Sequence, residues 1–106
     1  MVVGVCRLGL FFAGSGSLKN KRQGMRRVID RVRSKFNAAV AEVADQDVWQ
    51  RGTVGICVVG NDGSHVQSMI DNIIAFVEQL YVAQIVEREF EILHYSDEER
   101  FEEEDL

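Results

Sequence analysis

Proline is absent from this chain, cysteine occurs twice, and tryptophan once. Without proline, no slow prolyl isomerisation phase is expected in folding. Two cysteines cannot supply a disulfide framework, and a reducing compartment is the default for such a chain. No apolar run approaches the roughly eighteen residues of a membrane span, and the apolar segment 2–12 lacks the basic lead and cleavage site of a secretory signal. We therefore expect a cytoplasmic protein with no membrane segment.

The remaining composition is that of a globular protein. Of 106 residues, 46% are hydrophobic and 27% charged, which is enough apolar material for one core. The last ten residues, 97–106, carry seven acids, and such a segment cannot bury enough apolar surface to fold. We expect a single domain over residues 1–96 and a disordered acidic tail over 97–106.

Charge is distributed unevenly along the chain. The net charge is -5, yet residues 1–40 hold nine bases and one acid, whereas residues 41–106 hold three bases and sixteen acids. Eight bases cluster between residues 19 and 35, with Asp30 as the only acid among them. This asymmetry favours one face that binds polyanions.

The pattern of apolar residues predicts four strands and two helices. Branched and aromatic residues mark strands near 2–12, 38–43, 51–60 and 85–95. Helices are predicted after Ser17, which can cap the first one, and after Ser64, which with Gln67 forms a capping box for the second. The order βαββαβ predicts a ferredoxin-like α+β fold: a four-stranded antiparallel sheet in the order 4-1-3-2, with both helices on one face. On the last strand we expect Val86, Phe90 and Ile92 to face inward.

The loop before the first helix is a candidate anion-binding site, because a helix amino terminus offers free N–H groups. Its residues are Gly14, Ser15, Gly16 and Ser17. The segment is neither a Walker A loop nor a dinucleotide loop, since Lys19 stands where the third glycine would be. The alternative is an ordinary tight turn.

The first helix is the stronger candidate, because its bases lie on two of its faces and are opposed by one acid. Polyanion binding, RNA first, competes here with a merely solvated helix face. The predicted nucleic-acid-binding residues are Lys19, Lys21, Arg22, Arg26, Arg27 and Arg31.

The open face of the sheet is a poor candidate for RNA. It lacks the aromatic RNP1 pattern, and we expect Glu42, Glu87, Glu89 and Glu91 to repel phosphate there. An apolar centre rimmed by charge favours a homodimer interface instead. The predicted interface residues are Val3, Val5, Phe11, Cys57 and Val59.

Other reactive or aromatic residues are scattered. We expect Trp49 to cover the core, although it could anchor a partner, and Cys6 and Cys57 to remain buried free thiols on opposite faces of neighbouring strands. His65 and His94 have no ligand cluster near them in the sequence. We predict no catalytic residue, no metal site and no cofactor.

Several separated motifs resemble the YlxP-like family of small bacterial proteins, a domain of unknown function. They are Ser17-Leu18-Lys19-Asn20-Lys21-Arg22, the segment 36–43, the segment 47–51 and Gly60-Asn61-Asp62. The resemblance spans about residues 2–95 and implies a ferredoxin-like fold. It also implies a link to ribosome maturation or translation, because genes of that family often neighbour those for translation initiation factor 2 and ribosome-binding factor A. The family has SLKEKR where this chain has Asn20, so the cap at Ser17 should be weaker.

Together these observations predict a non-enzymatic RNA- or ribosome-associated protein that forms a homodimer. One rival is a phosphate-handling enzyme of acylphosphatase type, whose loop would need an arginine that residues 13–19 lack. Another is a dimeric regulatory module that binds a small ligand.

Overall fold

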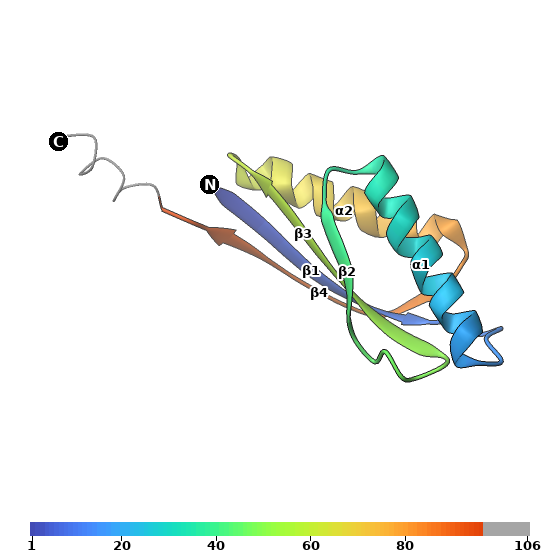
Figure 1. The fold of residues 1–106 in the computed structure, drawn as a ribbon. Coiled ribbons are helices and arrows are strands. Elements are labelled where there is room, and N and C mark those ends of the chain that lie inside the picture. The colour runs from blue at the N-terminus through green and yellow to red at the C-terminus, as the bar shows by residue number, and fades with distance from the viewer. Residues whose placement is uncertain (97–106) are drawn as a thin grey trace, which may run out of the picture.

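Six regular elements follow one another in the predicted order. The computed structural model describes residues 1–96, so the expected tail at 97–106 lies outside the described residues. The elements are β1 (Val2–Phe11), α1 (Leu18–Lys35), β2 (Ala39–Ala44), β3 (Arg51–Gly60), α2 (Gly63–Leu80) and β4 (Gln84–His94). The sheet has the order β2-β3-β1-β4, with all neighbours antiparallel. The predicted ferredoxin-like α+β fold is confirmed, and both helices cover one face of the sheet (Figure 1).

The core lies between that face and the two helices. Alternate side chains of the central strands point to it, because neighbouring residues of a strand face opposite sides. From β1 and β3 these buried residues include Leu8, Leu10, Val54, Ile56 and Val58. The helices add apolar stripes at three- and four-residue spacing, with Met25, Val28 and Val32 from α1 and Val66, Ile70, Ile73 and Val77 from α2.

The two helix caps differ in how well the sequence predicted them. Ser17 caps α1 as predicted, since its Oγ accepts a hydrogen bond of 3.1 Å from the Asn20 amide. The prediction of Ser64 as the cap of α2 was wrong. Asp62 takes that position and its Oδ2 accepts from the His65 amide at 3.0 Å, so α2 begins at Gly63. Aspartate and serine cap helices equally well, and the chain uses the first of the two.

The edge strand β4 departs from regular alternation. Its register against β1 shifts between Gly9 and Leu10, and an irregularity of this kind moves the following side chains to the other face. Consequently Ile85 packs against the core while Val86 is 47% exposed. The prediction that Val86 faces inward was wrong. Ile92 packs against the core as predicted. Phe90 pairs with the core residue Cys6 and so shares the helix-side face, but it is 50% exposed.

Candidate nucleic-acid interface

Helix α1 buries one stripe and presents bases on the rest of its circumference. Its buried residues are Lys21, Met25, Val28 and Val32, which recur at helical spacing and turn the remaining positions outward. Among those outward positions, the side chains of Lys19, Arg22, Arg26, Arg27 and Arg31 are exposed. Five of the six predicted RNA-contacting residues therefore lie on the surface.

A groove runs between α1 and β2 and gathers three of the arginines. Arg22, Arg26 and Arg33 line it together with residues of β2 and the following loop. Two acids also line it, Asp30 and Glu42, of which Glu42 is paired with Lys21. The Arg33 guanidinium donates a hydrogen bond to the carbonyl of Val40, which fixes this side chain along the edge strand and occupies one of its free acceptors. The groove thus has arginines at two successive turns of the helix, 22 and 26, and a third two turns further on, with Asp30 between them.

The other flank of α1 faces α2. Residues 27, 31 and 35 follow one another at four-residue intervals, so their side chains lie along one line. Lys35 closes this line, with its Nζ 5.1 Å from the centroid of the Phe76 ring on α2, a cation–π distance. Arg27 and Arg31 remain open to solvent.

The exposed bases of α1 are not neutralised within the described part of the chain. Among residues 1–96, ion pairs join Arg7 to Glu89, Lys21 to Glu42 and Arg88 to Glu78. None of these involves Lys19, Arg22, Arg26, Arg27 or Arg31. Solvated helix faces usually carry intermixed charges of both signs, whereas this surface carries an excess of positive charge.

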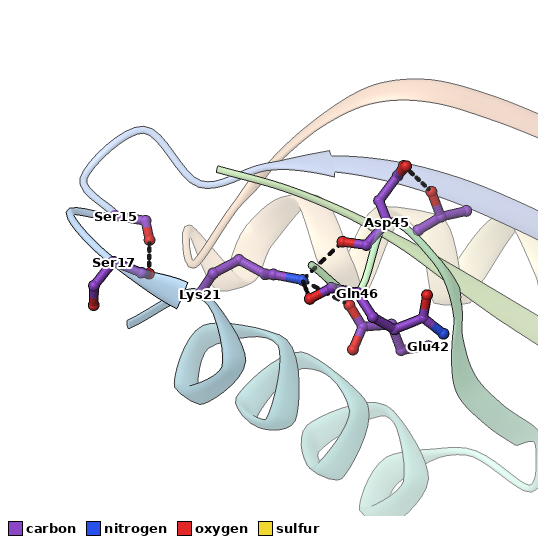
Figure 2. Close-up of polar contacts among 7 residues, drawn as sticks. Ser15, Ser17, Lys21, Glu42, Asp45 and Gln46 are labelled. Carbon is purple, nitrogen blue, oxygen red and sulfur yellow. Dashed lines mark hydrogen bonds and ion pairs between the residues drawn. The ribbon is translucent and has the colours of Figure 1, made fainter. Parts of the chain in front are cut away.

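Lys21 does not belong to that surface. Its side chain is fully buried, and the ammonium donates to Glu42 Oε2 at 2.9 Å and to the carbonyls of Asp45 and Gln46 at 3.0 and 3.1 Å (Figure 2). Three acceptors satisfy the three N–H donors of an ammonium. The prediction that Lys21 contacts a phosphate conflicts with this geometry, because the helix turns that position toward the β2–β3 connection.

Glu42 was also placed on the wrong face by the sequence pattern. It pairs across the sheet with Val54, a core residue, and so points to the helix side rather than to the open face. The signal that could have revealed this is the parity of β2, because buried Val40 lies two residues before Glu42 and shares its face.

The predicted anion-binding loop is closed by its own hydrogen bonds. Ser15 is 8% exposed, and its Oγ donates to the carbonyl of Ser17 at 2.9 Å. The Ser17 Oγ accepts from the Asn20 amide and donates to Asn20 Oδ1 at 2.8 Å. Asn20 thus stands at the capping-box position, but its Oδ1 accepts from the Ser17 hydroxyl and not from the Ser17 backbone N–H that a glutamate would bond. Both serine hydroxyls already have partners, which leaves the loop little beyond backbone groups to offer an anion.

The predicted dimer residues all face away from the helices, but they do not form one patch. Val3 pairs with Val59, and Val5 with Cys57, so these four side chains adjoin on the open face. Phe11 lies six residues beyond Val5, about 20 Å along the strand, and lines a separate pocket with Tyr81.

One residue of the open-face patch was missed. Leu93 of β4 pairs with Val3 and is 42% exposed, so it extends the apolar surface formed by the two valine pairs. Leu93 has the same strand parity as Glu87, Glu89 and Glu91. The sequence pattern therefore assigned that face of the strand to charged residues and missed the leucine. We define the open-face patch as Val3, Val5, Cys57, Val59 and Leu93.

The open face also carries an ion pair. Arg7 Nη2 lies 2.9 Å from Glu89 Oε1 across β1 and β4, and both side chains are more than half exposed. The hydrogen bond and charge of Arg7 lower the pKa of the Glu89 carboxyl below its usual value.

The two cysteines are free, as predicted. Cys6 lies in the core, where burial raises the pKa of its thiol. Cys57 lies on the open face and is only partly buried, so the expectation of two buried thiols holds for Cys6 alone.

Trp49 does not cover the core. Its side chain is 51% exposed in the β2–β3 connection, beside Val48, which is 41% exposed. The prediction of a core lid was wrong, since Phe12 fills the adjoining part of the core and its amide donates to the carbonyl of Gln50.

Over residues 1–96, no group of three or more histidine, cysteine, aspartate or glutamate side chains is arranged to hold a metal ion. Neither of the helices in the same range combines the length and apolar character needed to cross a bilayer.

Comparison with known proteins identifies relatives of unknown activity. A model of the family described as protein of unknown function (DUF503) matches residues 3–90. The uncharacterised protein YlxP of Bacillus subtilis (strain 168) is 31% identical over 77 residues, which are 73% of this chain and 84% of that protein.

Two solved structures are more distant. A C-terminal segment of the alpha subunit of aIF2 from Pyrococcus abyssi gives a TM-score of 0.43 at 12% identity, over 92% of this chain and 51% of that one. A REP-associated tyrosine transposase bound to a REP hairpin gives 0.41 at 12% identity, over 94% and 61%. This chain spans about half the length of the first, and neither likeness is close enough to carry an argument.

Proposed function

The chain belongs to the DUF503 family of proteins of unknown function, and we propose that it is a non-enzymatic, cytoplasmic, RNA- or ribosome-associated protein that acts in ribosome maturation or translation. The ribosomal setting comes from the gene neighbourhood that the family resemblance implies. The RNA partner is argued from this chain's own surface.

The observation that carries the proposal is the set of five exposed bases on α1 with no acid paired to them among residues 1–96. Bringing charges of one sign together costs free energy unless an anion compensates them. The five bases lie along two flanks of one helix, so an extended polyanion can contact several of them at once. Nucleic acid phosphates meet that requirement, and each contact releases counterions.

The groove beside β2 supports a phosphate backbone more than a compact anion. Arg22 and Arg26 line it one helical turn apart, about 6 Å along the surface, which is close to the spacing of successive phosphates in a strand. Arginine guanidinium groups bind phosphate oxygens bidentately. These contacts would give affinity and register without reading sequence.

The experiment is ribosomal subunit and RNA binding over a salt series, by sedimentation and by fluorescence anisotropy. The test variant is Lys19→Ala/Arg22→Ala/Arg26→Ala, in which alanine preserves the helix. We expect affinity at low salt to fall at least about tenfold, and the slope of log affinity against log salt to decrease by about 2 to 3.

The matched control carries the same change of charge on α2. Ser68→Glu/Asn72→Glu/Gln79→Glu alters three exposed positions on one face of that helix and adds three negative charges, so the net charge falls by three as in the α1 variant. It should bind with nearly the wild-type slope. An equal loss of affinity in both variants would show that the effect comes from net charge alone. Unchanged affinity in the α1 variant would contradict the proposal.

We further propose that two copies associate through the open-face patch. Val59 is 57% exposed and Leu93 42%, which is unusual for neighbouring large apolar side chains on a solvated sheet. A two-fold axis would bring this patch onto itself. Arg7 and the glutamates of β4 at its margin carry opposite charges and could pair between copies.

A further inference from the structure

A polar cleft lies on the flank of α1 away from β2. The first half of α1, the loop before it and the turn between α2 and β4 enclose an open space of about 330 Å³. Its floor is apolar, formed by Phe12, Gly24 and Val82. At Gly24 a Cβ would come within 2.8 Å of the Phe12 ring, so glycine allows the helix to approach this closely. The side chains above the floor are Asn20, Gln23, Arg27 and Tyr81.

Tyr81 combines a left-handed backbone conformation with an exposed aromatic ring. It follows the last residue of α2 in a left-handed conformation, with φ 55° and ψ 24°, where glycine or asparagine is usual. A tyrosine there strains the backbone. The ring is 89% exposed, so it recovers little of that cost through burial. Tyr81 lines this cleft and also the neighbouring pocket with Phe11, and its exposure leaves the ring accessible for stacking.

The other three side chains supply polar contacts. Among residues 1–96, Arg27 is the only charged residue that lines the cleft, and it has no ion pair with any of them. Asn20 uses its Oδ1 to accept from Ser17, which orients its amide NH₂ donors. Gln23 is exposed and offers both a donor and an acceptor.

We propose that this cleft binds one unpaired nucleotide of RNA. Tyr81 stacks on the base, the amides of Asn20 and Gln23 bond its edge, and Arg27 binds the adjoining phosphate. This combination is how single-stranded RNA is recognised, because its unstacked bases expose their faces and edges. The inference rests on the proposed function, since the bases of α1 would hold the strand that delivers the nucleotide.

The test compares a fluorescent eight-nucleotide single strand with a duplex of the same length. The variant Tyr81→Gly removes the ring and suits the left-handed backbone, so it should fold. We expect its affinity for the single strand to fall about five- to hundredfold, with the duplex affinity and the salt slope unchanged. Arg27→Ala should lower the single-strand slope by about 0.7. Tyr81→Phe should bind as wild type does.

Tyr95→Ala is the matched control, because Tyr95 is an exposed tyrosine at the end of β4, 67% exposed. It should leave single-strand binding unchanged. Adenosine monophosphate serves as a competitor, and displacement at the oligomer's own affinity would show a free-nucleotide site instead. If the wild type binds RNA through α1 and Tyr81→Gly binds single strands with the same affinity, the cleft proposal is wrong and the proposed function still stands. If the wild type binds neither RNA, the proposed function and this inference both fail.

Discussion

Lys21 illustrates how one residue can carry the same charge as its neighbours and a different role. Burying an ammonium costs several kcal/mol unless partners compensate it. Here Glu42 and two carbonyls of the β2–β3 connection do so, and Thr53 further steadies this connection by donating to Asp45 Oδ2 at 2.9 Å. Asp45 itself has φ 62°. Lys21 therefore ties the start of α1 to a connection with an unusual backbone.

Lys21→Ala should lower the free energy of unfolding by about 3 kcal/mol, because it removes the partner of the Glu42 carboxylate and of two carbonyls of the β2–β3 connection and leaves a cavity where the buried side chain was. Lys19→Ala, an exposed lysine two positions earlier, should change it by less than about 0.5 kcal/mol. Chemical denaturation measures both. The folded Lys21→Ala protein should retain its affinity for RNA, whereas Lys19→Ala should lose some. The opposite result, in which Lys21→Ala loses RNA affinity and Lys19→Ala does not, would show that Lys21 leaves its buried site to bind the ligand.

At the scale of elements, β4 combines an irregular register with a charged ladder. Glu87, Glu89 and Glu91 lie on the open face, and Arg7 of β1 engages the middle one. The strand is an edge, and charges along an edge discourage pairing with other sheets. Opposite it, Arg33 reaches the edge strand β2 from α1. Each edge of the sheet is thus protected by charge.

The Arg7–Glu89 pair predicts a measurable titration. Because Arg7 lowers the pKa of Glu89 in the folded protein, the pair stabilises the fold above the unfolded pKa of Glu89, and this contribution is lost as pH falls through the lower folded value. In Arg7→Gln the Glu89 pKa should rise toward its ordinary value, as followed by carboxyl NMR. Arg51→Gln, another exposed arginine, should not move it. An unchanged Glu89 pKa in Arg7→Gln would contradict the pairing.

At the scale of the whole molecule, the two faces differ in their surface chemistry. The helix side carries the exposed bases and the polar cleft, while the open face carries the apolar patch and the acids of β4. The proposed association through the patch would leave α1 exposed in both copies. A dimer of this kind would present two cationic surfaces, and binding at two linked sites strengthens attachment to a long RNA.

Val59→Asp should therefore abolish self-association, because it places a charge on the most exposed apolar side chain of the proposed interface. Sedimentation velocity over a concentration series measures this. The control is Val48→Asp, an exposed valine of the β2–β3 connection, which should associate as wild type does. The partly buried Cys57 gives a second measure, since its alkylation should slow as protein concentration rises. A wild-type protein that is monomeric throughout would refute the interface.

The acidic segment 97–106 suggests a further prediction for the whole chain. Seven acids in ten residues can compete with phosphate for the bases of α1. Deleting the segment should raise RNA affinity at low salt, and the difference should shrink as salt increases because screening weakens both contacts. Anisotropy titrations of the two chains measure it. Equal affinity at low salt would show that the tail does not compete.

The sequence alone determined the order of elements, the strand order and the basic character of α1. These depend on local periodicity and on topology rules, which a chain of this length expresses directly. It also placed Val3, Val5, Cys57 and Val59 on one face, since parity along a strand is local. Ser17 was identified as a cap for the same reason.

The tertiary structure alone decided which of the bases is buried and which aromatic rings are exposed. Lys21 could be excluded from the RNA surface only once Glu42 and the β2–β3 connection were placed against α1, because burial depends on segments distant in sequence. The irregular register of β4 likewise placed Ile85, and not Val86, against the core. No sequence motif marks the polar cleft. Asn20, Arg27 and Tyr81 line it together because Gly24 allows α1 to lie close to Phe12 of the core.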